Sequence, residues 1–185
     1  VFNRHHGRIE QEIGRITEIM NNILLMGRLD AGRMYFNPTE NDIAALIGSI
    51  VEEELYSHVG RSINFVVSGD TFWSNVDRSF ISYMLKNLIN NAFKYSSEGE
   101  VPEVSLTFEP LGFTVKVADH GIGIPEEELK NLFQSFYRAS NAENVQGTGL
   151  GLVIVKKLAE MHDGNVFAES LINKGSTFGF FIPKK

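Results

Sequence analysis

The stretch MLKNLINNAFKYS, Met84 to Ser96, combines an apolar helical face with a polar stripe beside it. At about 100° per residue, Asn87, Asn91 and Lys94 fall within a band roughly 60° wide. Asparagine is a modest helix former, because its side chain competes for backbone hydrogen bonds, so two of them one turn apart suggest a function. The neighbouring apolar stripe consists of Ile81, Leu85, Leu88 and Ala92. For this stretch alone, a solvated helix face is the simpler interpretation.

The composition of the chain is that of an ordinary folded protein, with 185 residues of which 43% are hydrophobic and 22% charged. This length allows one domain plus an appendage. A formal net charge of -6 argues against a surface for nucleic acid or anionic lipid, which would carry clustered Lys and Arg. The absence of cysteine excludes disulfides, thiolate metal sites and a thiol nucleophile. No apolar run approaches the roughly 20 residues of a membrane span, and we find no signal-peptide core.

The beginning of the chain predicts one long helix. Its apolar residues recur at spacings of four, three, four and three, which is typical of a helix in a bundle or coiled coil. Gly27 and Gly32 weaken the end of this helix, and Asn37-Pro38 stops it, because the residue before a proline avoids the helical region. We therefore divide the chain into a segment 1–36 and a domain 37–185. The apolar stripe consists of Ile9, Ile13, Ile16, Met20 and Ile23.

The remaining segments predict helices interleaved with strands, several of which are joined as hairpins. Helices are expected from an N-cap at Asn41 or Asp42 to Tyr56, and over 78–95, 126–133 and 149–162, with a loop over 134–148. Strands are expected over 62–69, 73–76, 104–108, 113–121, 166–170 and 177–182. This order predicts an α+β sandwich with one mixed sheet and helices on one face.

The sequence contains two glycine clusters, of which the first follows a predicted strand and the second precedes a predicted helix. In DHGIG, Gly121 and Gly123 would let a flat ligand approach the backbone, and Asp119 could accept a hydrogen bond from an exocyclic amine such as that of adenine. A tight strand-to-helix turn is an equally good interpretation of this motif alone. In QGTGLGLVIVKKL, three alternating glycines precede an apolar helix, so bare N-H groups and the helix dipole could bind phosphate. This second cluster matches neither the P-loop nor the dinucleotide fingerprint, and a purely structural loop remains open.

The three elements together predict a nucleotide site. The side-chain oxygen of Asn91 suits a hard cation such as magnesium, which prefers a few protein oxygens together with phosphates and waters. Lys94 could neutralise phosphate charge. Five motifs, NLINNAFKYS, DHGIGIP, LFQSFYR, QGTGLGL and GSTFGFFIP, occur in an order that resembles the N, G1, F and G2 boxes and the final glycine strand of the ATP-binding domain of bacterial sensor histidine kinases. The motifs cover roughly Thr39 to Lys185, and their shared order makes the resemblance specific.

The resemblance implies a Bergerat-type ATP-binding α/β sandwich, preceded by a long N-terminal helix, that binds ATP and magnesium and phosphorylates a histidine. Asn91 resembles the magnesium ligand, and Asn87 the residue one turn earlier that supports metal and γ-phosphate positioning. Lys94 resembles a phosphate contact, so that Asn87 and Lys94 are the implied catalytic residues. Tyr95 resembles a wall beside the base, and Asp119 the carboxylate that reads adenine. The other implied nucleotide contacts are Gly121, Gly123, Ile124, Phe136, Arg138, Gly147, Thr148, Gly149, Leu150, Gly151 and Thr177.

The loop over 147–151 resembles the phosphate-side hinge of a mobile lid, and Phe133 and Phe136 resemble its hydrophobic anchors. Arg138 resembles a residue that reaches the γ-phosphate or a neighbouring domain, although a solvated lid arginine is an equally good interpretation. The segment RIEQEIGRITEIMNNILLMGRLDAGRM, Arg8 to Met34, resembles the second helix of the dimerisation and phosphotransfer hairpin of the family. The first helix of that hairpin has no counterpart in the sequence.

The family's phosphoacceptor is a histidine followed by an acidic residue, with a proline five positions after the histidine. None of the five histidines of this chain satisfies this pattern. We therefore expect the catalytic fragment of a longer kinase. The resemblance implies a cytoplasmic domain of a membrane-anchored sensor kinase, a second kinase protomer and a response regulator receiver domain as partners, and no nucleic acid partner.

Two other functions stay open at this point. Related ATPases of the gyrase, mismatch-repair and heat-shock chaperone type carry a glutamate where Asn87 stands, which activates water, so Asn87 disfavours hydrolysis. A regulatory module that binds nucleotide without catalysis would act through its partners. The intact asparagine, aspartate and glycine positions speak against such a decayed enzyme.

Overall fold

The computed structural model describes residues 2–97, 99–142, 145 and 147–185, with side chains described from Ile13 onward except those of Arg15 and Glu18. The chain forms two compact units, Val1–Tyr35 and Phe36–Lys185. The first unit contains the long helix α1 (Phe2–Asp30), which confirms the predicted N-terminal helix.

The end of α1 is closed by a glycine turn. Gly32 has φ +62°, its N-H donates to Leu29 O, and Arg33 N-H donates to Arg28 O. This pair of hydrogen bonds is the Schellman arrangement that commonly ends helices at a left-handed glycine. Of the predicted apolar stripe, Ile9 lies outside the described side chains, while Ile13, Ile16, Met20 and Ile23 are exposed.

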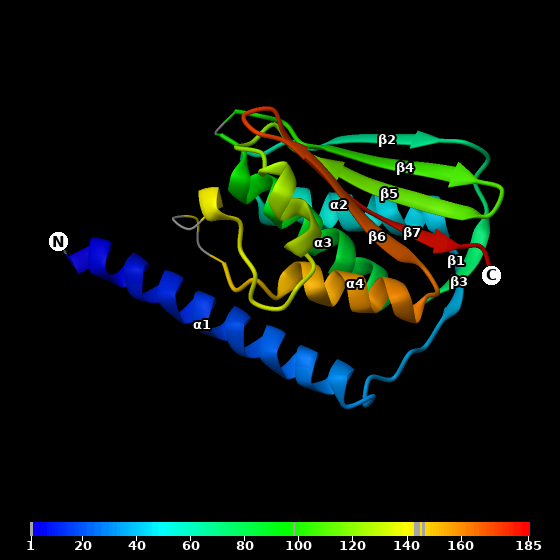
Figure 1. Cartoon of the computed structure of the whole chain (residues 1–185), viewed down its shortest axis with the longest axis horizontal. Coiled ribbons are helices and arrows are strands. Elements are labelled where there is room, and N and C mark those ends of the chain that lie inside the picture. The colour runs from blue at the N-terminus through cyan, green and yellow to red at the C-terminus, as the bar shows by residue number, and fades with distance from the viewer. Residues whose placement is uncertain (1, 98, 143–144, 146) are drawn as a thin grey trace. The chain divides into compact units, whose positions relative to one another are not determined.

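The second unit is built on a mixed sheet of five strands in the order β2-β4-β5-β7-β6 (Figure 1). Strand β2 is parallel to β4, and the other neighbours are antiparallel. Two hairpins, β4-β5 and β6-β7, meet at the centre through the pairing of β5 with β7. The strands are β2 (Asn64–Ser68), β4 (Glu103–Glu109), β5 (Gly112–Ala118), β6 (Asn165–Leu171) and β7 (Gly175–Pro183).

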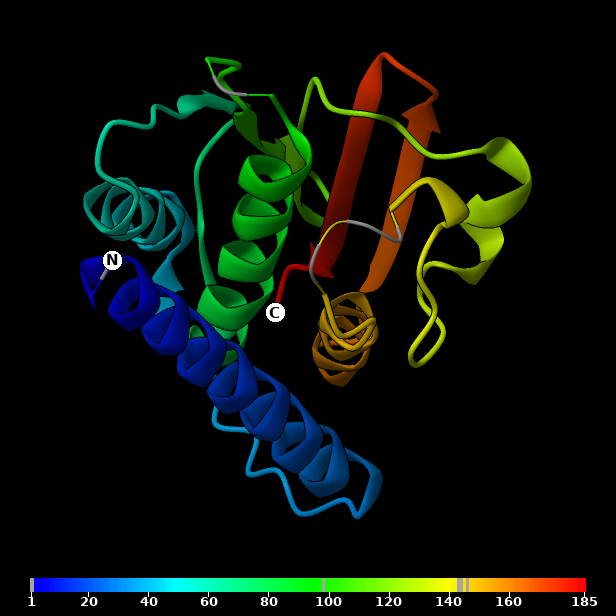
Figure 2. The same ribbon diagram turned by 90° about the vertical axis from the view of Figure 1, so that its left-hand side faces the viewer.

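Three helices, α2 (Ile43–Ser57), α3 (Arg78–Tyr95) and α4 (Gly151–Met161), cover one face of this sheet, and α3 lies between the other two (Figures 1 and 2). Their apolar faces and the inward side chains of the strands form the core. The predicted α+β sandwich with a mixed sheet and helices on one face is therefore confirmed. Its largest fully buried side chains include Ile43, Ile47, Ile50, Ile81, Met84, Leu85, Leu88, Ile89, Leu106, Phe113, Leu150 and Phe180.

Aspartates begin two of these helices. Asp42 accepts a hydrogen bond from Ala45 N at 3.0 Å at the start of α2, and Asp77 Oδ1 accepts from Ser79 N and Phe80 N at the start of α3. Such caps satisfy N-H groups that have no partner within the helix. The predicted start of α3 at Arg78 is confirmed, and of the two N-caps predicted for α2 the structure has Asp42.

Two elements differ from the sequence prediction. A strand β1 (Thr39–Asp42), which was not expected, pairs antiparallel with β3 (Trp73–Val76) in a separate two-stranded sheet. The helix expected over 126–133 is shorter in the structure and is the 3-10 helix η1 (Glu126–Asn131). Its turns are closed by i to i+3 hydrogen bonds, which short helical pieces often use. A second 3-10 turn, η2 (Ser140–Ala142), lies within the loop before α4.

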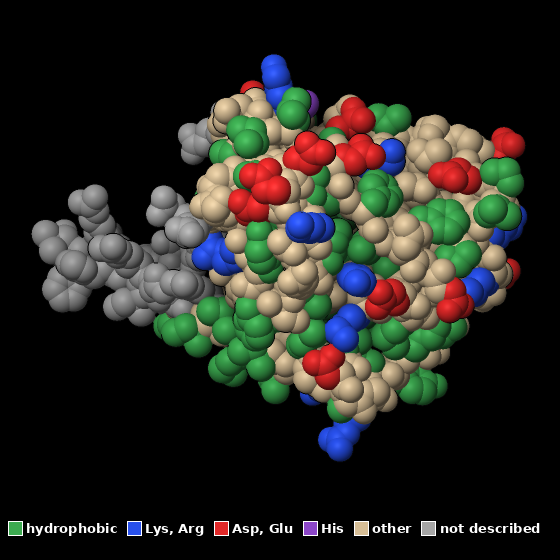
Figure 3. Space-filling view, viewed as in Figure 1, with side chains coloured by type: hydrophobic (Ala, Val, Ile, Leu, Met, Phe, Trp, Pro, Cys, Tyr) green, Lys and Arg blue, Asp and Glu red, His purple; other side chains and the backbone are tan. Residues whose placement is uncertain are grey.

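Acidic and basic side chains are interspersed on the face of the molecule seen in Figure 3. No large basic patch appears on that face, in keeping with the net charge of -6. Among the described residues, no helix is long and apolar enough to cross a membrane.

Candidate functional site

The polar stripe of α3 contains a pair of asparagines that contact each other. Asn91 Nδ2 donates to Asn87 Oδ1 at 3.3 Å, and both side chains are half-buried. Asn90 points away from this pair, because its Nδ2 donates to Glu54 Oε2 at 3.3 Å and to Lys86 O at 2.8 Å. Within the described part of the chain, Asn91 Oδ1 accepts no hydrogen bond. The helix therefore presents one amide oxygen that can accept a further ligand.

The N-terminus of α4 lies against this pair. A Cβ atom on Gly151 would stand 2.5 Å from Asn87 Nδ2 and 2.8 Å from Asn87 Oδ1, so a side chain here would force the Asn87 amide to move. No side chain caps the helix at Leu150. The first N-H groups of an uncapped helix and its positive dipole end favour anions. Phosphate oxygens are suitable ligands for such a helix start.

Lys94 and Tyr95, at the C-terminal end of α3, approach the glycine loop. A Cβ atom on Gly147 would lie 2.8 Å from Lys94 Nζ and 3.8 Å from Tyr95 Oη, and Lys94 Nζ lies 5.0 Å from the centre of the Tyr95 ring. Burial raises the pKa of the Tyr95 hydroxyl, so this group is neutral near pH 7. A cation and a neutral phenol therefore flank the start of the predicted phosphate loop.

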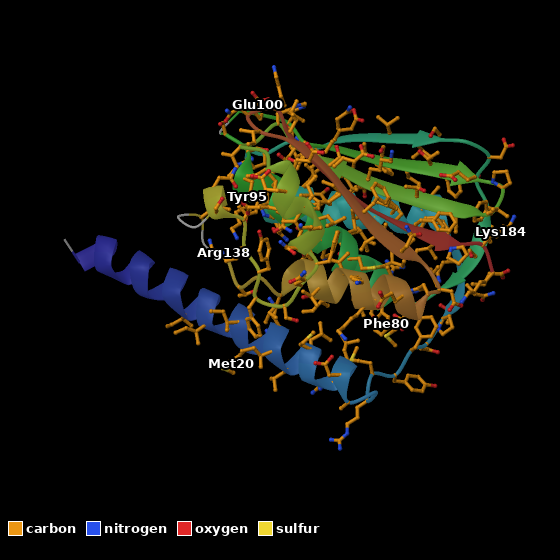
Figure 4. The ribbon with its side chains drawn as sticks, viewed as in Figure 1. Met20, Phe80, Tyr95, Glu100, Arg138 and Lys184 are labelled. Atoms are coloured by element: carbon orange, nitrogen blue, oxygen red, sulfur yellow. The ribbon has the colours of Figure 1, made fainter. Side chains whose placement is uncertain are left out.

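Arg138 lies near the same end of α3 as Tyr95, while Phe80 marks the other end of that helix (Figure 4). Arg138 Nη2 donates to Ala142 O at 2.5 Å and also to Val145 O. The guanidinium therefore shapes the loop that precedes α4. This excludes a fully solvated arginine, and a contact of Arg138 with the γ-phosphate stays a prediction.

Asp119 follows the end of β5 and is only 6% exposed. Its Oδ1 accepts from Gly121 N at 2.8 Å and from Ser176 N at 3.2 Å. Burial raises the pKa of the Asp119 carboxyl, and these two N-H groups partly oppose the rise. Among the described residues, none donates to Oδ2, so one carboxylate oxygen is fixed by the backbone and the other can accept a ligand.

The glycines beside Asp119 allow the turn to pack closely against other backbone segments. A Cβ atom on Gly121 would collide with the carbonyl oxygen of Tyr95, and one on Gly123, which has φ +64°, would collide with that of Leu171. At these two positions the protein's own backbone occupies the direction of a Cβ atom, and the approach of a flat ligand to the glycines stays a prediction. The glycines let the turn pack closely onto α3 and β6, which fixes Asp119 relative to Tyr95.

Sequence reasoning missed Ser176. The register of β5 and β7 pairs Ala118 with Thr177, and Ser176 N and O both bond to Asp119. The predicted contact Thr177 is half-buried one residue further along β7. Ile124 N, also a predicted contact, donates to Ser170 Oγ at 2.8 Å. Only the pairing register, which the sequence did not specify, could have identified Ser176.

The loop before α4 is shaped by two left-handed residues. Phe136 has φ +65° and its N-H donates to Gly149 O at 3.0 Å, while Gly149 has φ +69°. Phe136 is 69% exposed, so the prediction that it anchors the loop is wrong in this structure. Its left-handed backbone and the close approach of Gly149 turn the ring outward, whereas Phe133 is half-buried. Thr148 Oγ1 accepts from Leu150 N at 3.2 Å directly before α4.

The described residues contain no group of three or more His, Cys, Asp or Glu side chains that could hold a metal ion. Magnesium would therefore depend on an amide oxygen such as that of Asn91, on phosphate oxygens and on water. This donor set fits magnesium, which usually keeps several waters and binds few protein ligands beside a nucleotide.

Comparisons with known proteins agree with this geometry. A sequence profile described as "Histidine kinase-, DNA gyrase B-, and HSP90-like ATPase" matches residues 76–185. Sensor histidine kinase WalK of Bacillus subtilis is 30% identical over 183 residues, which cover 95% of this chain and 30% of WalK. Sensor protein SrrB of Staphylococcus aureus is 31% identical over 177 residues, which cover 94% of this chain and 30% of SrrB. The chain thus spans about a third of the length of these curated relatives.

Solved structures give the same result. The catalytic domain of histidine kinase ThkA is 30% identical, with a TM-score of 0.65, and the match covers 82% of this chain and 97% of that one. Full-length ShkA, in complex with AMPPNP, matches the whole of this chain over 39% of its own length, with a TM-score of 0.82 and 24% identity, which shows the fold. The chain therefore belongs to the histidine kinase-, DNA gyrase B- and HSP90-like ATPase family, as the ATP-binding catalytic domain of a sensor histidine kinase.

Proposed function

We propose that this chain binds ATP together with Mg²⁺ and positions the γ-phosphoryl group for transfer to a histidine on the helical hairpin of the full-length kinase. One observation carries the proposal: Gly151 brings the uncapped N-terminus of α4 against Asn87. This contact supports the proposal because the start of α4, the proposed phosphate site, lies beside the only pair of asparagines that bond to each other among the described residues. The relative whose structure contains AMPPNP supports a nucleotide ligand.

Each part of the proposed site has one task. Asp119, fixed through Oδ1, accepts the exocyclic amine of adenine through Oδ2. Asn91 supplies a magnesium ligand and Asn87 orients Asn91 through the hydrogen bond at 3.3 Å. Bound magnesium would offset phosphate charge. Lys94 and the N-H groups at the start of α4 hold the phosphate oxygens.

Phosphoryl transfer needs little covalent chemistry from the protein, because positioning and charge stabilisation account for most of the catalysis. The site accordingly offers amides, a cation and a helix N-terminus. The position of Asn87 carries an amide, which cannot act as a general base toward water. This favours transfer to a histidine over hydrolysis.

The partners are proposed from the relatives, which are sensor kinases about three times as long as this chain. We infer that the phosphate passes to a histidine of the hairpin and then to an aspartate of a response regulator. A second kinase protomer would complete the helical hairpin dimer to which α1 contributes. The chain would be the cytoplasmic part of a membrane-anchored sensor.

Calorimetric titration tests the proposal. ATP would be titrated into the wild type, Asn91→Ala and Asn90→Ala, each with and without magnesium. Asn90→Ala is the matched control, since it removes an amide from the same helix that points toward Glu54. We expect magnesium to strengthen ATP binding to the wild type and to Asn90→Ala, and to have much less effect on Asn91→Ala. Absence of ATP binding by the wild type at millimolar concentration would overturn the proposal.

A further inference from the structure

The turn that carries Asp119 is bonded to the place where β6 ends and β7 begins. We call residues 119–125 the base turn and residues 170–176 the β6–β7 corner. Asp119 N donates to Ser176 O at 2.8 Å. A Cβ atom on Gly175 would stand 1.9 Å from Asp119 O, so the two backbones lie in direct contact. The base turn therefore depends on the corner for its position.

One serine near the end of β6 bonds to both segments. Ser170 Oγ accepts from Ile124 N at 2.8 Å and donates to Gly175 O at 2.9 Å, and it lies 3.0 Å from Ser176 Oγ. A serine hydroxyl has one hydrogen to donate and two lone pairs that accept. Because Ser170 gives its hydrogen to Gly175 O, the bond between the two hydroxyls is donated by Ser176. The Ser170 hydroxyl thus uses its donor and both of its acceptor positions.

Ser176 connects this hydroxyl to the carboxylate of Asp119. Its N-H donates to Asp119 Oδ1 at 3.2 Å, while its Oγ bonds to Ser170. Ser176 is only 8% exposed, so water does not readily replace these bonds, and a buried polar group left without a partner is costly. Ser170 therefore holds the base turn at Ile124 and, through Ser176, one of the two N-H donors that fix Asp119.

We propose that Ser170 is a positioning residue for base recognition: its hydroxyl sets the base turn against the β6–β7 corner and so fixes the direction of Asp119 Oδ2. The inference rests on the proposed function of Asp119. A recognition group must be held within about 0.5 Å and 10–20° of its working geometry, which supporting hydrogen bonds provide. The bonds of Ser170 lie in the base turn and the corner, whereas the proposed phosphate contacts come from α3 and the start of α4. Loss of the hydroxyl should therefore weaken recognition of the base and spare the phosphates.

The test compares ATP with inosine triphosphate, which has the same phosphates but an oxygen in place of the amine of adenine. Ser170→Ala removes the hydroxyl and Ser170→Thr keeps it. Ser68→Ala is the matched control, because Ser68 Oγ donates to Thr107 Oγ1 at 3.1 Å between two other strands of the same sheet.

In calorimetry, we expect the ratio of ATP to inosine triphosphate affinity to fall about 3- to 10-fold in Ser170→Ala, as for one weakened hydrogen bond. The affinity for inosine triphosphate should stay within about twofold of the wild type. Ser170→Thr and Ser68→Ala should keep the wild-type ratio. An unchanged ratio in Ser170→Ala, an equal loss of both nucleotides, or an equal fall in Ser170→Thr would overturn the proposal.

A second measurement needs no nucleotide. Hydrogen exchange of the free protein should be faster at the amides of Ile124 and Ser176 in Ser170→Ala than in Ser170→Thr or Ser68→Ala. The Ile124 amide loses its acceptor, and the Ser176 amide loses its fixed position beside Asp119 Oδ1. Equal exchange at both amides would contradict the positioning role even if the wild type failed to bind ATP. Failure of the proposed function, which would appear as a wild type that binds neither nucleotide, is thus separable from failure of this inference.

Discussion

Replacing Asp119 by asparagine should change the base preference of the site. In the structure Oδ1 accepts two backbone N-H groups, from Gly121 and Ser176. An asparagine in the same place must keep its carbonyl oxygen at Oδ1, because its NH₂ group cannot accept those bonds. The NH₂ group then occupies the position of Oδ2. The exocyclic amine of adenine would meet a donor where it now meets an acceptor.

The size of the effect follows from this geometry. A hydrogen bond to a charged group contributes about 1.5–3 kcal/mol, so the Kd for ATP should rise roughly 10- to 150-fold. Inosine triphosphate carries an oxygen in place of the amine, which the new NH₂ group can bind. The ratio of ATP to inosine triphosphate affinity should therefore fall by at least the same factor. The fold should be retained, because the two backbone hydrogen bonds are kept and a buried charge is removed.

Calorimetric titration of both nucleotides into the wild type and Asp119→Asn measures this ratio, and thermal unfolding of the two proteins checks the fold. An equal loss of ATP and inosine triphosphate binding would show that Asp119 does not read position 6 of the base. Unchanged ATP affinity would refute the assignment of Asp119 altogether.

Three further predictions concern Asp119, Gly151 and His162. Burial raises the pKa of Asp119, so ATP affinity should begin to decline with falling pH at a higher pH than an ordinary aspartate would cause. The added proton would sit on Oδ2, because Oδ1 accepts from Gly121 N and Ser176 N, and a hydroxyl there is a weaker acceptor for the base amine than a carboxylate oxygen. In a pH series of titrations, Asp119→Asn should lack this decline. Gly151→Ala should weaken ATP binding more than adenosine binding in calorimetry, since its Cβ would stand 2.5 Å from Asn87 Nδ2 and displace the Asn87 amide that bonds to Asn91. Burial lowers the pKa of His162 below its ordinary value of 6.5, so near and below that pH the unfolded chain binds more protons than the folded chain. Thermal stability should therefore fall as the pH drops below about 6.5. The dependence of the melting temperature on pH should be weaker in His162→Gln, and an equal dependence in both proteins would refute the reasoning.

Much of the fold could be predicted because its elements carry local signals. The helix over 78–95 has an aspartate cap at Asp77 and a regular apolar stripe, and its predicted bounds match the structure. The strands over 104–108 and 177–182 have strong β-forming residues and turn residues beside them. Strand β1 was missed because TEND contains little that favours a strand, and only its pairing with β3 makes it one.

The site was predictable where it depends on helical periodicity. The spacing of Asn87 and Asn91 predicted that their amides lie one turn apart on the same stripe, and the structure adds a hydrogen bond between them. Ser176 depends on the register between two strands far apart in the sequence, for which no local pattern exists. Phe136 was misplaced because its left-handed backbone reverses the direction that an aromatic residue in an apolar motif would usually take.

The most direct test of the account is phosphoryl transfer in trans. The chain would be incubated with γ-labelled ATP, magnesium and a separately supplied helical hairpin that carries the phosphoacceptor histidine of a relative, and the wild type would be compared with Asn91→Ala and Asn90→Ala. The account predicts acid-labile label on the hairpin with the wild type and Asn90→Ala, and a loss of about 100-fold or more in rate with Asn91→Ala. Release of free phosphate without label on the hairpin, or equal labelling by Asn91→Ala, would contradict it.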